Sequence, residues 1–152
     1  MFSGTGRRTR IGSWTRPNVR ESNWIRRRGS NGTAADMNED QAALAEFNGV
    51  ARLFPLPNLV LFPQALQPLH IFEPRYRQLT ADALIDDRLL ALVLLKPGWE
   101  QNYEQTPAIF PVACLGRIVA DQLMPDGRSN LLVRGLSRVR IVESRIDPRR
   151  SN

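Results

Sequence analysis

Apolar side chains are concentrated in one continuous part of the chain. Leu, Val and Ile are frequent from Val50 to Ile146, whereas residues 1–33 contain almost no aliphatic side chains. A chain of 152 residues is enough for one domain. The pattern predicts a folded domain over 50–146, a short helix or linker over 37–49, a disordered Arg-rich tail at 1–36 and a disordered end at 147–152.

Within the folded part, the hydrophobic period is mostly that of β-strands. Pro125-Asp126-Gly127 separates two apolar stretches and is typical of a hairpin turn. A short apolar run, residues 59–62, is closed by Pro63. About six strands are predicted, within 50–54, 66–72, 89–95, 112–123, 130–134 and 138–142.

One principal helix interrupts the strands. It begins at Pro74, because proline is tolerated in the first helical turn. Tyr76, Leu79 and Ala83 fall on one face, and Asp86-Asp87 ends the helix. A shorter helix is expected over residues 38–47, capped by Asn38 and ended by Asn48-Gly49. The predicted fold class is mainly β (α+β), barrel-like or sandwich-like.

The positive charge belongs to the N-terminal segment. Residues 1–33 carry eight Arg against Glu21, whereas residues 34–152 carry 13 basic and 14 acidic side chains. The folded part is therefore close to neutral, which argues against a nucleic-acid surface on it. The segment could be a disordered tail without a fixed role, a transit peptide or a non-specific nucleic-acid binder. Met37 is a candidate start residue.

Three Pro-containing motifs occur in a characteristic order: Phe54-Pro55, Phe62-Pro63 and Phe72-Glu73-Pro74-Arg75-Tyr76. With the hairpin and the segments 115–118 and 132–141, they resemble the N-terminal substrate-binding domain of Lon proteases. The resemblance covers about residues 50–146 and is closer still to small stand-alone bacterial proteins built on that domain. It assigns structural roles to Pro55, Pro63, His70, Phe72, Glu73, Pro74, Arg75, Tyr76, Gly116, Asp126, Gly127 and Gly135.

The resemblance implies a PUA-like β-barrel that binds unfolded or signal-bearing polypeptide in protein quality control. In the family, a further strand and a helical bundle follow the segment 138–142, and here the helical bundle is absent. We therefore expect a truncated or frame-shifted product with an unpaired strand edge, which invites pairing with another chain.

The residues needed for Lon catalysis are missing. Lys96 is the only lysine and Pro97 follows it, so the chain has no phosphate-binding loop and no suitable Ser-Lys dyad. Cys114 is the only cysteine and His70 the only histidine, and these two residues are too few for a tetrahedral zinc site. Cys114 is interpreted as a buried apolar residue, and His70 as a partner in a structural hydrogen bond. We expect no enzyme activity, no cofactor and no metal.

Glu73 has two structural interpretations. It could cap the helix that begins at Pro74, or it could pair with Arg75 or Arg77.

Two functions are considered. The first is polypeptide recognition by Phe62, Pro63, Trp99 and Tyr103, as apolar anchors on exposed loops. The alternative is RNA binding through the PUA-like barrel and its basic C-terminal strand, in which Arg138 and Arg140 would lie on one face. The longest apolar runs, such as 89–95, have seven residues, which is too short to span a membrane. The chain is expected to be cytoplasmic.

Overall fold

The computed structural model describes residues 7–13, 34–101 and 107–146. The strands are β1 (Arg7–Ser13), β2 (Val50–Leu56), β3 (Leu66–Ile71), β4 (Leu89–Leu95), β5 (Ile109–Leu123) and β6 (Ser129–Ile146). The helices are α1 (Ala34–Glu46), α2 (Pro74–Ile85) and the short 3₁₀ helix η2 (Trp99–Gln101).

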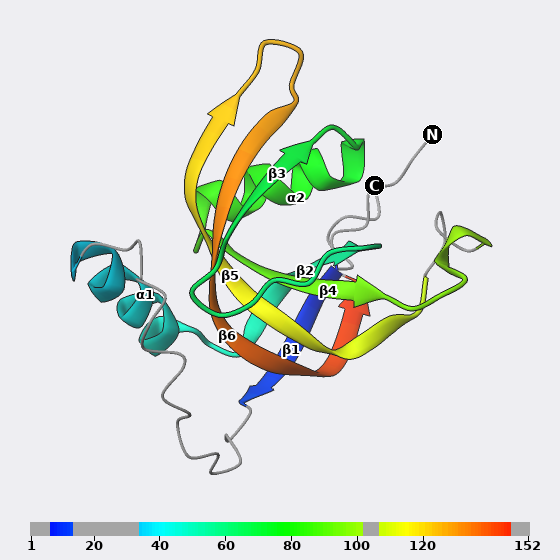
Figure 1. Cartoon of the computed structure of the whole chain (residues 1–152), viewed down its shortest axis with the longest axis horizontal. Helices are drawn as coiled ribbons and strands as arrows, with labels where there is room; N and C mark the ends of the chain where they lie inside the picture. The colour runs from blue at the N-terminus through cyan, green and yellow to red at the C-terminus, as the bar shows by residue number, and fades with distance from the viewer. Residues whose placement is uncertain (1–6, 14–33, 102–106, 147–152) are drawn as a thin grey trace.

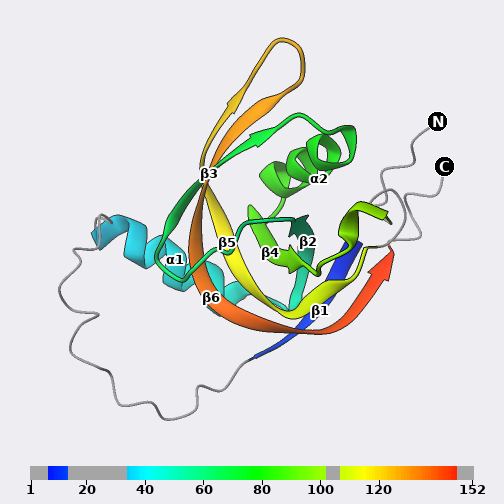
Figure 2. The same ribbon diagram turned by 45° about the vertical axis from the view of Figure 1, so that its right-hand side comes forward.

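The six strands form one sheet that closes on itself. Their order is β1-β2-β4-β5-β6-β3, and β1 also pairs with β6, so five strands form a barrel with β3 attached outside the closure. β2 and β4 are parallel and the other pairs are antiparallel. The β5–β6 hairpin projects beyond the barrel beside β3 and α2 (Figures 1 and 2). The prediction of a mainly β, α+β fold is confirmed.

β6 is one long strand rather than the two expected strands. Its first part pairs with β3 from Ser129 to Arg134, and its last part pairs with β1 from Val139 onward. β5 runs beside it from Ser129 to Arg140. The predicted strands left residues 135–137 between them, but Gly135 stays in the strand opposite Gly116, next to a register shift. Such irregularities bend a strand without ending it.

The expected disorder of residues 1–36 differs from the structure in two places. Residues 7–13 form β1, and α1 begins at Ala34. β1 pairs with Val50–Arg52 of β2 and with residues 139–146 of β6, so it covers the edge that was expected to be unpaired. Pairing between main chains needs no apolar side chains, and the sequence pattern therefore gave no signal for β1.

Alternate residues of the barrel strands supply two hydrophobic clusters. The first contains Phe54, Leu90, Leu92 and Ile118, together with the buried face of α2. The second is built from smaller side chains of β2, β4, β5 and β6: Ala51, Leu53, Leu89, Ala91, Val93, Ala113, Leu115 and Val139. This alternation is the two-residue period of a sheet that is buried on both faces.

α2 and the hairpin follow the sequence prediction. Pro74 occupies the first turn of α2, and Tyr76, Leu79 and Ala83 are buried. The Tyr76 ring stacks on Phe54 with centroids 4.3 Å apart, and its hydroxyl donates to the Pro55 carbonyl at 2.8 Å. The helix is thereby fastened to β2.

Candidate functional site

An apolar groove lies between the segment that follows β2 and the strands β4 and β5. Its volume is about 280 Å³. One wall is the run of residues 59–63, and the other is formed by Leu92 and Leu94 of β4 with residues 110 and 112–114 of β5. Arg138 of β6 adds a charged side chain to an otherwise apolar lining.

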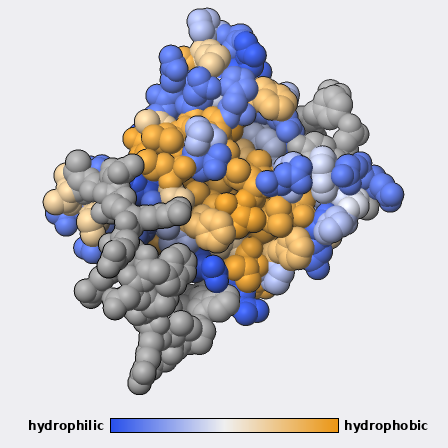
Figure 3. Space-filling model, viewed as in Figure 1, coloured by the Kyte–Doolittle hydropathy of each residue, from blue (hydrophilic) through white to orange (hydrophobic). Residues whose placement is uncertain are grey.

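Large apolar side chains at this groove are exposed. Phe62 is 57% exposed, Val60 55% and Phe110 38%. Figure 3 shows a hydrophobic area at the centre of this face, where the segment after β2 crosses in front of β4 and β5 in Figure 1. Clustered exposed apolar side chains mark interaction sites more often than scattered ones do.

The Phe62-Pro63 turn is held against β6 at Gly135. The Gln64 amide donates to the Gly135 carbonyl at 2.7 Å, and the Gly135 amide donates to the Ala65 carbonyl at 2.9 Å. A Cβ at residue 135 would overlap the Phe62 carbonyl and lie 3.2 Å from the Pro63 Cα. Glycine at 135 is therefore required for the backbone of the turn to approach β6.

A second glycine allows the same segment to pack on the sheet. A Cβ at Gly116 would lie 2.6 Å from Val133 Cγ1 and 3.1 Å from Leu61 Cδ2. Leu61 is buried, whereas its neighbours Val60 and Phe62 are exposed. The run of residues 59–63 thus anchors itself through Leu61 and presents the flanking side chains outward.

Cys114 lines the groove but is itself buried, with 4% exposure. Burial raises the pKa of its thiol to about 11, against the opposing effect of hydrogen bonds from the backbone of residues 136 and 137. The thiol is therefore protonated near neutral pH and is a poor nucleophile. This agrees with the interpretation of Cys114 as a buried apolar residue.

The structure places only two of the four predicted binding residues at the groove. Phe62 and Pro63 line the groove. Trp99 is half-buried in η2 and does not line it, and Tyr103 lies outside the described residues. Val60 and Phe110 also line the groove and were not predicted. The apolar run 59–62 and the Phe110-Pro111 step were the available signals.

Several family-motif residues make structural contacts. His70 Nδ1 lies 2.7 Å from Asn130 Oδ1, across the β3–β6 pair, and its ring stacks loosely with Phe72. Glu73 forms an ion pair with Arg75 at 3.0 Å rather than a side-chain cap on α2.

The hairpin turn is fastened to α2. The Asp126 carbonyl accepts a hydrogen bond from Arg77 at 2.9 Å, and Gly127 adopts φ 84°. Hydrogen bonds from the backbone and side chain of Arg128 lower the pKa of the Asp126 carboxyl. These contacts fix the turn between β5 and β6.

Two other kinds of feature are absent from the described residues. No group of three or more His, Cys, Asp or Glu side chains there is arranged to hold a metal ion. Within the same residues, no helix has the length and apolar character needed to cross a membrane.

The described strands thus form a small, mainly β barrel with an exposed apolar groove. Residues 50–150 match the model of the ATP-dependent protease La (LON) substrate-binding domain, so the chain belongs to that family. The resemblance inferred from the Pro-containing motifs is confirmed.

Relatives among known proteins are full-length proteases. Lon protease 2 of Syntrophobacter fumaroxidans is 33% identical over 91 residues, 59% of this chain and 11% of that protein. Lon protease of Dictyoglomus thermophilum is 33% identical over 95 residues, 62% of this chain and 12% of that protein. The chain thus spans only a small part of these relatives.

A solved structure is also similar. The Lon N-terminal domain protein from Xanthomonas campestris is 31% identical, with a TM-score of 0.49, over 64% of this chain and 52% of that one.

Proposed function

We propose that the chain is a non-catalytic module that recognises unfolded or signal-bearing polypeptide through the apolar groove. The observation that carries this proposal is the set of exposed Val60, Phe62 and Phe110 side chains around one apolar cavity. Membership of a substrate-binding-domain family supports it. The Lon protease relatives support a role in protein quality control, and a single free cysteine supports a cytoplasmic location.

The groove suits extended apolar segments better than charged ligands. Its lining is mostly Leu, Val and Phe, which bind by burying apolar area without a fixed hydrogen-bond pattern. Such binding tolerates many sequences, as recognition of unfolded chains requires. The relatives named above are proteases, and they give no support to RNA binding.

The test measures binding of a fluorescently labelled, permanently unfolded model protein to the purified chain. Phe62→Ser and Val60→Ser should each weaken binding about fivefold or more, because each removes a partly exposed anchor of roughly 1–2 kcal/mol. Ile85→Ser is the matched control, since Ile85 is 87% exposed on α2 and does not line the groove.

The outcome separates the two functions considered. Polypeptide binding should change little between low and moderate salt, whereas RNA binding would weaken steeply. Equal binding by Phe62→Ser, Val60→Ser and Ile85→Ser would contradict the groove as the site. Trp99→Ala tests whether the site extends to η2.

A further inference from the structure

A second surface of the domain carries two arginines that face each other. Arg117 of β5 lies directly opposite Arg134 of β6 in the strand register. Their side chains are only 12% and 11% exposed. Like charges in opposing positions repel, and more so when they are withdrawn from water. The two guanidinium groups therefore need nearby carboxylates to offset their mutual repulsion.

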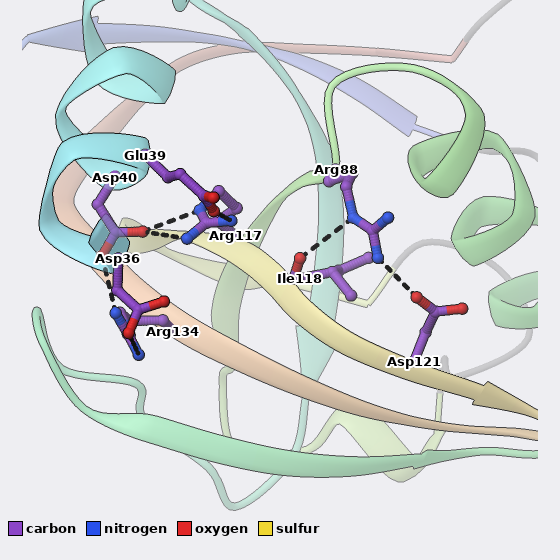
Figure 4. A network of polar contacts seen from close by, with 8 residues as sticks. All are labelled: Asp36, Glu39, Asp40, Arg88, Arg117, Ile118, Asp121 and Arg134. Atoms are coloured by element: carbon purple, nitrogen blue, oxygen red, sulfur yellow. Dashed lines mark hydrogen bonds and ion pairs between the residues drawn. The ribbon is translucent and has the colours of Figure 1, made fainter. Parts of the chain in front are cut away.

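The carboxylates come from α1. Asp40 contacts both arginines, at 2.7 Å from Arg117 Nη2 and 3.4 Å from Arg134 Nη1. Glu39 lies 3.0 Å from Arg117 Nη1, and Asp36 lies 3.9 Å from Arg134 Nη2. Figure 4 shows the three acids of α1 pointing at the two arginines.

Apart from these ion pairs, α1 is weakly attached. None of its residues is buried. Ala43 of α1 and Phe47, just beyond the helix, pack against the second hydrophobic cluster, and both are only partly buried. A cleft of about 550 Å³ remains beside the helix, lined by residues of α1 and by Arg52, Leu89 and Arg117 of the barrel. The contact between α1 and the barrel therefore leaves this cleft open at its side.

The arginines and the acids belong to different parts of the chain. Arg117 and Arg134 lie within the segment 50–150 that matches the family model, whereas α1 precedes it. The connection from α1 to β2 is short and includes Gly49 at φ 84°, a conformation that glycine adopts freely. The two arginines thus lie inside the matched domain, whereas α1, which covers them, lies outside it.

We propose that the Arg117–Arg134 surface is a docking site for an acidic helix of a partner protein, and that α1 occupies it as an intramolecular substitute. The partner helix is defined by the chemistry of α1. It carries carboxylates at positions i, i+3 and i+4, as Asp36, Glu39 and Asp40 do, and small or aromatic apolar side chains at i+7 and i+11, as Ala43 and Phe47 do.

The experiment uses a labelled peptide with the sequence of residues 34–49, titrated into the full chain and followed by fluorescence anisotropy. The triple variant Asp36→Asn, Glu39→Gln, Asp40→Asn releases α1 and should bind the peptide about tenfold or more tightly than the wild type. In the wild type the tethered helix competes at an effective concentration on the order of millimolar. Glu46→Gln is the matched control, because Glu46 takes no part in these ion pairs, and it should behave as the wild type does.

Two further variants identify the surface. The first adds Arg117→Gln and Arg134→Gln to the triple variant and should abolish peptide binding. The second adds Phe62→Ser to the triple variant and should leave peptide binding unchanged. The second result keeps this site separate from the groove. The proposal is overturned if the folded triple variant does not bind the peptide, if binding survives loss of both arginines, or if the bound species is a dimer of the chain.

Amide hydrogen exchange of the wild-type chain supplies a test without variants. Amides of α1 should exchange about tenfold or more faster than those of β5, because α1 opens without unfolding the barrel. Equal protection of α1 and β5 would mean that the helix leaves only on global unfolding, and would overturn the proposal.

Discussion

Replacing Gly135 with alanine tests how the groove is built. The added methyl would overlap the Phe62 carbonyl, which is backbone and cannot rotate away. The turn must therefore move off β6, and the two backbone hydrogen bonds of 2.7 and 2.9 Å at Gly135 are strained or lost. Overpacking costs about 1–3 kcal/mol and each of the two hydrogen bonds about 0.5–1.5 kcal/mol, so we expect a loss of about 2–6 kcal/mol in the free energy of unfolding.

Urea unfolding followed by circular dichroism measures this loss. Gly98→Ala is the control, because a Cβ there meets no atom within 4 Å and the cost is only the strain of φ 87°, about 1–2 kcal/mol. Gly135→Ala should also weaken polypeptide binding, since it displaces Phe62, whereas Gly98→Ala should not. A Gly135→Ala protein of wild-type stability and affinity would refute the close approach of the turn to β6.

Three further predictions concern the core, the pH dependence and the closure of the barrel. Tyr76→Phe should lower stability by about 1 kcal/mol, because the Pro55 carbonyl loses its donor, and unchanged urea midpoints would contradict this bond. Folding raises the Cys114 pKa from 9.0 to about 11. The contribution of the buried neutral thiol to stability is therefore complete below pH 9 and is lost as pH rises toward 11, because the thiol ionises more readily in the unfolded chain. Cys114→Ala should flatten the stability profile in that interval, and an identical slope in both proteins would argue against it. Thr9→Pro should disrupt β1, because proline cannot donate a ladder hydrogen bond, at a cost of about 1–3 kcal/mol. It should expose the edges of β2 and β6 and give concentration-dependent association in light scattering, and a monomer of unchanged stability would show that β1 does not close the barrel.

Elements with strong local signals were predictable from the sequence. Pro74 in the first turn and Asp86 beyond the last turn delimit α2 almost to the residue. Pro125-Asp126-Gly127 forms the expected turn, closed by a hydrogen bond from the Gly127 amide to the Met124 carbonyl. These features depend on neighbouring residues, and local chemistry therefore determines them.

Features that depend on distant pairing were not predictable. β1 has an Arg-rich sequence, and only the neighbouring β2 and β6 make it a strand. The prediction of Phe62 and Pro63 as binding residues is untested, although both line the groove, and Phe110 was missed because only the fold brings β5 beside residues 59–63. The arginine pair of β5 and β6 likewise depends on strand register.

The position of β1 has a consequence for the order in which the protein forms during synthesis. β1 leaves the ribosome before the rest of the barrel, yet its longest pairing is with β6, the last of the described strands, from Arg7 opposite Ile146 to Ser13 opposite Val139. The barrel therefore cannot close until β6 has emerged. Pairing across so many residues is intrinsically slow. In that interval the main chain of β1 is available to chaperones or to other nascent chains.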